Sequence, residues 1–222
     1  MGVTTTKTNK PYNPRAQDAS PLAYNRAALY SGKALSFDGV NDSIDISAID
    51  ETIIQSAFSF HTIIKKENNA TDNDRIIDIT IDSNNAFNLI TDNASQKYAV
   101  YLKIGGSNEV NQLTYSPIVF DELAAITFVW DGSSGAFYYN GQLVESTGSA
   151  LIGFGTAGAF LGKRTDGVSS TFFNGLMSGV RVFNTALTAA QIADLYNFPE
   201  KIVPTGVDNT ALKLWFPMME SA

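Results

Sequence analysis

The 222-residue sequence contains no cysteine and only one histidine, His61. The lack of thiols excludes disulfides, zinc–thiolate sites and thiol catalysis. No apolar run approaches the roughly 18 residues of a membrane-spanning helix, so we do not expect a membrane protein. Residues 1–7 lack the apolar core of a signal peptide. We therefore expect a soluble protein that is intracellular or leaves the cell by another route, such as release inside a virus particle.

Basic residues are also scarce, and a third of them lie near the N-terminus. The chain has 15 Lys and Arg against 22 Asp and Glu, for a net charge of −7. An acidic surface repels phosphate backbones, which argues against nucleic acid as a partner of the main body. Residues 1–33, however, hold five basic residues and one acidic residue.

This basic segment also contains three prolines, which disfavour regular strand pairing. We predict that residues 1–33 form an extended arm, because charge blocks of this kind often serve as interaction tails. The alternative is a disordered terminus. The residues predicted to dock the arm on a neighbouring subunit are Lys7, Lys10, Tyr12, Arg15, Tyr24 and Arg26.

From residue 34 onward, short apolar segments with period-two alternation are separated by turn residues, as in residues 43–47. Asn140-Gly141 is the strongest hairpin signal, because both residues tolerate positive φ. About a dozen such segments predict one all-β sandwich over residues 34–222. A capping box from Thr188 to Gln191 predicts one short helix at about 189–197, ended by Pro199. A last strand is predicted at about 211–217.

Five stretches in four regions resemble a known family in the same order along the chain. They are residues 32–42 (GKALSFDGVND), 126–144, 160–162 with 173–183, and 184–196. Together they resemble the laminin-G-like jelly-roll domains of the concanavalin A-like lectin and glucanase fold. The resemblance implies a two-sheet antiparallel jelly-roll sandwich. It also implies a surface role, because such domains are frequent on phage tails, fibres and capsids.

The sequence departs from the family pattern in places. Tryptophans that are usual near Leu123 and within residues 60–64 are missing, which puts a sugar-stacking role for those positions in doubt. The usual opening strand is absent before residue 32, whereas residues 212–220 have its character. We hypothesise that the last strand takes the place of the missing first strand, as in a circular permutation. The alternative is an edge strand or a hook onto a partner.

Catalytic patterns are missing. The glucanases of this fold place carboxylates on one strand as Glu-x-Asp-x-x-Glu, and no glutamate here has aspartate two positions later. No Gly-x-Ser-x-Gly elbow accompanies His61, which we interpret as a polar-face residue. Asp74, Asp78 and Asp82 are evenly spaced on one strand, about 13 Å apart between successive residues. We interpret them as one solvated sheet face.

Calcium is the cofactor that the resemblance suggests, because several relatives bind it. Its ligands are carboxylate, amide and carbonyl oxygens. The candidate ligands are Asp38, Asn41 and Asp42, with the loop at residues 68–74 as a second choice. The alternative is that these residues simply form turns.

A sugar site combines an aromatic ring with amide and carboxylate partners. The candidate polar residues are Asn84, Asn85, Asn93, Asn108 and Asp166, and the candidate rings are Tyr98 and Tyr101. The alternative is that the aromatic residues only pack the core or a sheet face.

These observations predict a non-enzymatic module on a virion surface, either a decoration or a fibre-associated protein, with weak adhesion to cell-surface glycans. The arm would attach it to coat or tail proteins, and we expect it to be oligomeric in that assembly. One alternative is a capsid cement protein without a ligand. The other is a glycan-degrading enzyme of the same fold.

Overall fold

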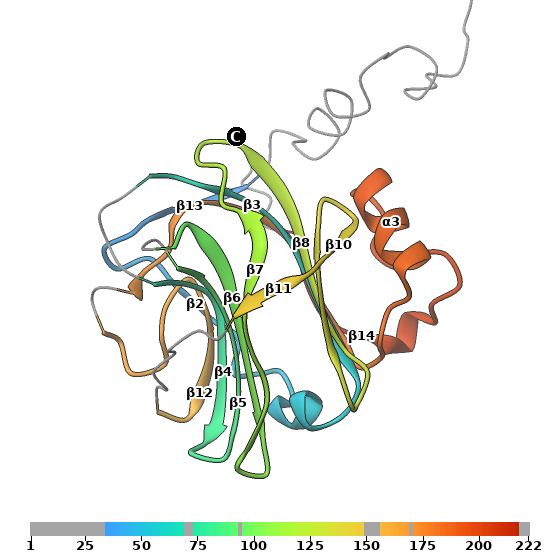
Figure 1. The fold of residues 1–222 in the computed structure, drawn as a ribbon, viewed down its shortest axis with the longest axis horizontal. Coiled ribbons are helices and arrows are strands. Elements are labelled where there is room, and N and C mark those ends of the chain that lie inside the picture. The colour runs from blue at the N-terminus through green and yellow to red at the C-terminus, as the bar shows by residue number, and fades with distance from the viewer. Residues whose placement is uncertain (1–33, 69–72, 93–94, 149–155, 169–170, 218–222) are drawn as a thin grey trace, which may run out of the picture.

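The computed structural model describes residues 34–68, 73–92, 95–148, 156–168 and 171–217. These residues form two antiparallel sheets that face each other, with one α-helix outside one of them (Figure 1). The predicted all-β sandwich is confirmed. The arm at residues 1–33, with all six predicted docking residues, lies outside the described residues. Within the described residues, no helix is long and apolar enough to span a membrane.

One sheet, called the β3 sheet, has the strand order β1-β13-β3-β8-β9-β10, and β14 also pairs with β13. Its strands are β1 (Leu35–Asp38), β3 (Phe58–Lys66), β8 (Leu123–Trp130), β9 (Gly135–Tyr139), β10 (Gln142–Val144), β13 (Asn174–Phe183) and β14 (Leu212–Phe216). β1 and β14 pair with the first and second half of β13, on the edge opposite β3. The predicted last strand is therefore an edge strand in line with β1.

The other sheet, called the β5 sheet, has the order β11-β7-β6-β5-β4-β12-β2. Its strands are β2 (Ile44–Asp45), β4 (Asp74–Asp82), β5 (Asn85–Asp92), β6 (Lys97–Ile104), β7 (Ser107–Pro117), β11 (Ser146–Gly148) and β12 (Gly158–Leu161). A 3-10 helix, η1 (Glu51–Gln55), lies between β2 and β3 in the sequence.

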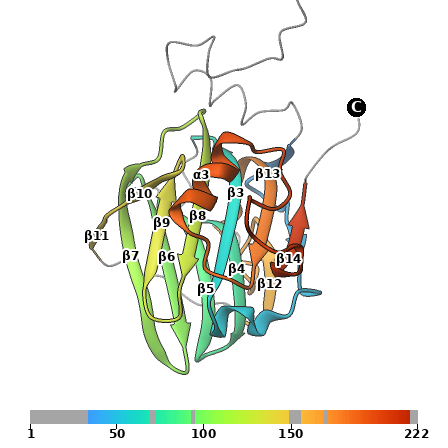
Figure 2. The same ribbon diagram turned by 90° about the vertical axis from the view of Figure 1, so that its right-hand side faces the viewer.

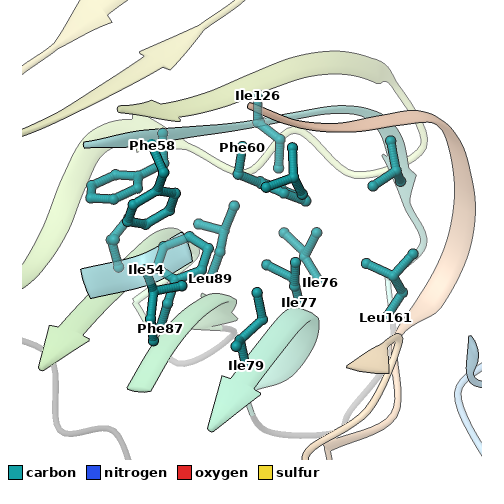
Figure 3. Close-up of a cluster of buried hydrophobic side chains, with 14 of the residues drawn as sticks. Ile54, Phe58, Phe60, Ile76, Ile77, Ile79, Phe87, Leu89, Ile126 and Leu161 are labelled. Carbon is teal, nitrogen blue, oxygen red and sulfur yellow. The ribbon is translucent and has the colours of Figure 1, made fainter. Parts of the chain in front are cut away.

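The main core lies between the two sheets and is filled by every second residue of their central strands (Figure 3). Phe58 on β3, Phe87 on β5 and Phe128 on β8 pack together, with ring centroids 5.0 to 5.8 Å apart. The burial of each side chain of this size stabilises the folded state by about 1.5–3 kcal/mol. The period-two alternation of the sequence therefore becomes an inward apolar face on each sheet.

A second apolar layer covers the outer face of the β3 sheet. The helix α3 (Ala189–Asn197) lies across this sheet (Figure 2). Its buried Ile192 and Leu195 pack in one cluster with Val129 and Phe183. The Thr188 capping box is present as predicted, with Gln191 as its partner. The chain then returns through η3 (Asn209–Ala211) to β14.

Residues 198–211, which connect α3 to β14, are called the returning segment. Arg181 on β13 binds this segment to the sheet. Its guanidinium donates hydrogen bonds of 2.5 to 3.1 Å to the carbonyls of Pro199, Lys201 and Ile202, and one of 2.8 Å to that of Gly179. The Arg181 side chain is 2% exposed. One buried cation thus satisfies several loop carbonyls that no regular structure pairs.

His61 lies in the same layer, paired in register with Arg181. It is 1% exposed, and its Nδ1 lies 2.8 Å from Thr127 Oγ1. The interpretation of His61 as a polar-face residue is therefore wrong, because α3 and the returning segment bury this face of the sheet. Burial, with Arg181 nearby, holds the pKa of His61 well below its ordinary value, so the ring is neutral.

Candidate functional site

A row of residues crosses the outer face of the β5 sheet from one strand to the next. Phe160 on β12, Asp78 on β4, Asn88 on β5, Tyr101 on β6 and Asn111 on β7 are successive partners in register. Paired residues point to the same face. Their neighbours along β4, β5 and β6 belong to the core, so these residues point outward. Four strand spacings give the row a length of about 19 Å. We call it the polar row.

Asp78 is the charged centre of the polar row and is fully buried. Its Oδ1 accepts hydrogen bonds from Thr80 Oγ1 at 2.8 Å and Asn88 Nδ2 at 3.1 Å. Its Oδ2 accepts a bond from the Thr165 amide at 3.4 Å and lies 3.6 Å from Arg75 Nε. Burial raises the pKa of Asp78, and Arg75 opposes that rise. The predicted solvated face is wrong at this position.

The prediction of a solvated sheet face is also wrong at Asp74. This residue is fully buried on the opposite, inner side of the sheet, where its carboxylate forms an ion pair with Lys66 Nζ at 2.8 Å. The register between β4 and β5 shifts between Arg75 and Ile77, as in a β-bulge. An extra residue reverses the alternation, which is why even spacing does not keep the aspartates on one face. Asp82 alone is exposed, and it accepts the Asn84 amide in the next turn.

The loop between β12 and β13 adds charge beside the polar row. Arg164 and Asp166 form an ion pair of 3.2 Å, with side chains 20% and 24% exposed. Thr165, between them, is the residue whose amide contacts Asp78. Desolvation lowers the pKa of Arg75 to about 10, and Asp166 is among the charges that act on it. The structure thus brings the predicted site residue Asp166 to the polar row.

Two neighbouring hairpin ends continue the site at β7. The Gly106 amide donates to the Asn84 carbonyl at 3.0 Å, and the Gly105 amide donates to Asn85 Oδ1 at 2.9 Å. Both glycines have positive φ, which this turn requires. Lys103 Nζ adds a 2.7 Å bond to the Ser83 carbonyl. The β4–β5 and β6–β7 turns are therefore held together.

Asn108 and Tyr101 connect these hairpin ends to the polar row, because the Tyr101 hydroxyl donates a hydrogen bond to Asn108 Oδ1. The structure therefore brings Asn84, Asn85, Asn108 and Tyr101 together, as a sugar site would require. Asn108 and Asn84 are exposed, whereas Tyr101 is 4% exposed. The remaining amide candidate, Asn93, lies outside the described residues.

Tyr98 does not belong to this site, and its assignment as a ligand-binding ring needs correction. It is 1% exposed in the core, where its ring stacks on Phe137 at 5.5 Å. Burial raises its pKa far above the usual value for tyrosine. Tyr98 and Tyr101 are three residues apart on β6, so they point to opposite faces and cannot serve one ligand.

Sequence reasoning missed Asn88, Arg75 and Arg164. Asn88 carried a usable signal, because it alternates with the core residues Phe87 and Leu89 and so had to face outward. The two arginines carried no such signal. Arg75 lies three residues before Asp78 on β4, but only the register shift between Arg75 and Ile77 places the two on one face. Arg164 comes near Asp78 through a loop more than 80 residues away along the chain.

The calcium candidates form a turn after β1. Asp38 Oδ1 accepts the amides of Val40 at 2.8 Å and Asn41 at 3.1 Å, and Asp42 Oδ2 accepts the Asp38 amide at 3.0 Å. These bonds lower the pKa of Asp38. These hydrogen bonds agree with the turn alternative, and calcium binding by Asp38, Asn41 and Asp42 stays a prediction. Within the described ranges, no cluster of three or more His, Cys, Asp or Glu could hold a metal.

Comparison with known proteins agrees with this architecture. The family model described as the concanavalin A-like lectin/glucanases superfamily matches residues 38–193. The chain belongs to this superfamily. A search of curated proteins found no match.

Similar solved structures include a carbohydrate binding protein, a pentraxin and a sialidase. A "putative carbohydrate binding protein" from Bacteroides ovatus is 21% identical with a TM-score of 0.58, over 85% of this chain and 52% of that protein. A heptameric SAP-like pentraxin from Limulus polyphemus is 17% identical with a TM-score of 0.50, over 72% and 80%. Trypanosoma rangeli sialidase is 13% identical with a TM-score of 0.57, over 77% and 28%. At these identities the likeness shows the fold.

Proposed function

We propose that this superfamily member is a non-catalytic carbohydrate-binding module whose ligand site is the outer face of the β5 sheet. The observation that carries the proposal is the continuity of polar groups across that face, from Asp166 through Asp78, Asn88 and Tyr101 to Asn108.

The chemistry of the face suits a polyhydroxylated chain. Amide and carboxylate side chains recognise sugar hydroxyls as donors and acceptors. The exposed Asn84 and Asn108 are at one end, and the partly exposed Asp166 is near the other. A face of about 19 Å spans several sugar units lying across the strands. The hairpin ends are already hydrogen-bonded to each other, so binding would order little chain.

The same face is poorly suited to glycoside hydrolysis. That reaction uses two carboxyl groups, about 5–5.5 Å apart in retaining enzymes and about 6.5–9.5 Å apart in inverting ones. Both oxygens of Asp78 are engaged by Thr80, Asn88, Thr165 and Arg75. The Glu-x-Asp-x-x-Glu pattern is also missing. These features support binding without catalysis.

Attachment to virion coat or tail proteins through residues 1–33 stays a prediction, as do the virion surface as location and oligomerisation in that assembly. The salt sensitivity of particle attachment would test the basic arm, because exposed charges are screened at high ionic strength.

A glycan array with the full chain, with calcium and with chelator, tests the proposed function. The double variant Asn84→Ala, Asn108→Ala should lose binding, whereas Asn209→Ala, an exposed asparagine on η3, should keep it. Absence of binding by the unmodified protein would favour the cement-protein alternative. Release of reducing sugar from a bound glycan would instead show the enzyme.

A further inference from the structure

Residues 185–210, called the α3 segment, leave the β3 sheet after one strand and return to it at another (Figure 2). β13 ends at Phe183, and β14 begins at Leu212. The Asn184 amide donates a hydrogen bond of 2.9 Å to the Ala211 carbonyl, so the two ends of the segment meet. The structure describes the whole segment, which contains α3, part of η3 and loops but no strand. It can therefore lift from the sheet without breaking a strand pair.

One carboxylate connects α3 to the residues that follow it. Asp194 on the helix accepts hydrogen bonds of 2.8 and 2.9 Å from Lys201 Nζ, and it accepts the Thr205 amide at 2.8 Å. Because these bonds lie within the α3 segment, they do not oppose its separation from the sheet. The helix and the residues after it should move as one unit.

Two polar side chains of the sheet, Ser59 and Arg181, bind the α3 segment. Ser59 Oγ donates to the Thr185 carbonyl at 2.8 Å and accepts the Leu187 amide at 2.9 Å. Arg181 donates to the carbonyls after α3. The apolar cluster between the segment and the sheet is much smaller than the core between the two sheets. Units with few buried contacts open more easily than the whole domain unfolds.

His61 lies buried beneath the α3 segment, with one ring nitrogen unpaired. Its Nδ1 is bonded to Thr127 Oγ1, whereas its buried Nε2 has no hydrogen-bond partner. Arg181 is its register partner, and the Cβ atoms of such pairs lie about 4.5–5.5 Å apart. Burial lowers the pKa of Arg181 to about 10, so the guanidinium is charged at neutral and mildly acidic pH. A proton on His61 therefore adds a second positive charge and a donor without an acceptor.

The elements around His61 supply no carboxylate to its ring. Their other ionisable side chains are Lys65 and Lys66 on β3, Arg181 on β13, Tyr138 on β9, and Asp194, Tyr196, Glu200, Lys201 and Asp208 on the α3 segment. Asp194 is paired with Lys201, and Asp208 accepts a backbone amide in η3. Glu200 is exposed, and its charge acts on Arg181. Among these described elements, none of the three carboxylates is hydrogen-bonded to the His61 ring.

We propose that the α3 segment is a lid that opens in mild acid, with His61 as the residue that responds to pH. Protonation of His61 places two cations side by side in a buried layer, and opening of the lid returns both to water. The strands stay paired, and the apolar outer face of the β3 sheet, including Val129 and Phe183, becomes accessible. This inference concerns the face opposite the proposed ligand site and does not depend on the proposed function.

The direction of the pH effect follows from the two states of the lid. In the closed state, burial, with Arg181 nearby, holds the pKa of His61 well below its ordinary value. In the open state the ring is in water, with a pKa of about 6.5. The open state therefore binds the proton first as the pH falls. Closure is fully favoured above about pH 6.5, and below it the opening equilibrium rises by up to about tenfold per pH unit until the closed-state pKa is reached.

Hydrogen exchange of the full chain tests the lid, with rates corrected for the intrinsic pH dependence of amide exchange. Between about pH 7.5 and about pH 5, the protection of amides in residues 187–204 should fall about tenfold to thirtyfold. At both pH values these amides should be less protected than those of β6. Urea below the unfolding range should accelerate exchange in β6 but leave the lid amides nearly unchanged, because a local opening exposes little surface.

Two variants identify the residue that responds to pH. His61→Gln keeps a polar group for Thr127 but cannot titrate, so the lid should be equally protected at both pH values. The control is Asp194→Asn, which should lower lid protection at both pH values and keep the response to acid. Burial raises the pKa of Asp194, but hydrogen bonds from Lys201 and Thr205 lower it overall, so this carboxylate stays ionised over the range.

The unmodified protein gives a second readout that needs no variant. His61 is the only histidine, so its ring signals in an NMR titration are assigned at once. We expect the ring to titrate below about pH 6.5, the value of an exposed histidine. Titration at that ordinary value would overturn the proposal, as would lid and β6 amides that share one protection and one urea response. An acid response that is absent, or that survives in His61→Gln, would also overturn it. None of these outcomes bears on glycan binding.

Discussion

The outer face of the β3 sheet is covered by α3 and the returning segment, whereas the outer face of the β5 sheet carries the polar row (Figures 1 and 2). Both faces contain a buried arginine. Arg181 on the first is bonded to backbone carbonyls that need a donor, and Arg75 on the second lies beside an aspartate. On the first face, the returning segment supplies the hydrogen-bond partners of the arginine.

This difference indicates what each face is for. The first face is closed by an apolar layer that includes Leu195 and Phe183, and a ligand there would have to displace it. One buried atom of the first face, His61 Nε2, lacks a hydrogen-bond partner, but it lies under this layer. On the second face, Asn88 Oδ1 and Thr165 Oγ1 lack partners among charged and amide groups, an arrangement that costs stability. We therefore assign structure to the first face and recognition to the second.

The largest expected effect on stability comes from deleting β14, the C-terminal edge strand of the β3 sheet. Deletion of residues 210–222 removes β14, whose Leu214 and Phe216 pack against the main core. The domain should unfold, or its melting temperature should fall strongly. Lys213→Ala, an exposed change on the same strand, is the control and should have little effect. An unchanged melting temperature after the deletion would refute both this role of β14 and the circular-permutation hypothesis.

The two arginines give the next contrast. Arg181→Met should lower the free energy of unfolding by about 1.5–3 kcal/mol, because the carbonyls of the segment after α3 lose a charged donor. Arg164→Met, on a side chain that is 20% exposed, should cost less than about 1 kcal/mol. Urea unfolding of both variants measures the difference. Equal losses would contradict the assignment of stability to the first face.

The pH dependence of stability should report on His61, the only histidine. Its pKa is lowered in the folded state, so the unfolded chain binds a proton first as the pH falls. Stability should therefore fall from about pH 6.5 downward until the folded pKa is reached, by about 1.4 kcal/mol for each unit of pKa difference. His61→Gln should flatten this slope between about pH 6.5 and 5. A slope that persists in the variant would assign it to other groups.

The smallest effect on stability is expected on the second face. Asn108→Ala should lower the free energy of unfolding by no more than about 1 kcal/mol, because Asn108 is exposed and loses one hydrogen bond, from the Tyr101 hydroxyl. Its affinity for a bound glycan should nevertheless fall about threefold to tenfold, as one hydrogen bond to ligand is lost. Isothermal titration and urea unfolding on the same sample check both numbers. A large loss of stability with unchanged affinity would make Asn108 structural.

The sequence predicted those parts of the fold that depend on neighbouring residues. The Asn140-Gly141 turn has positive φ at both residues and joins β9 to β10, and the Thr188 capping box starts α3. The β-bulge at Arg75 could not be predicted in this way, and it alone moves Asp74 and Asp78 to opposite faces. Local pattern determines strands and turns, whereas a bulge is set by packing.

The candidate site was predictable only in part for the same reason. Asn84, Asn85 and Asn108 were found because turn residues cluster where hairpins end. Tyr98 was assigned wrongly because alternation along β6 was not applied to the pair Tyr98 and Tyr101. The contact of Thr165 with Asp78 joins residues 87 positions apart. No local rule connects such residues, so the charged half of the site needed the structure.

Hydrogen exchange with and without an oligosaccharide identified on the array tests the assignment of the two faces most directly. We expect slower exchange in residues 74–92, 97–111 and 156–168, which hold the polar row, the hairpin ends and the Arg164 loop. Residues 189–217, which cover the other face, should exchange at an unchanged rate. Protection confined to residues 189–217 would place the ligand on the covered face and contradict the account.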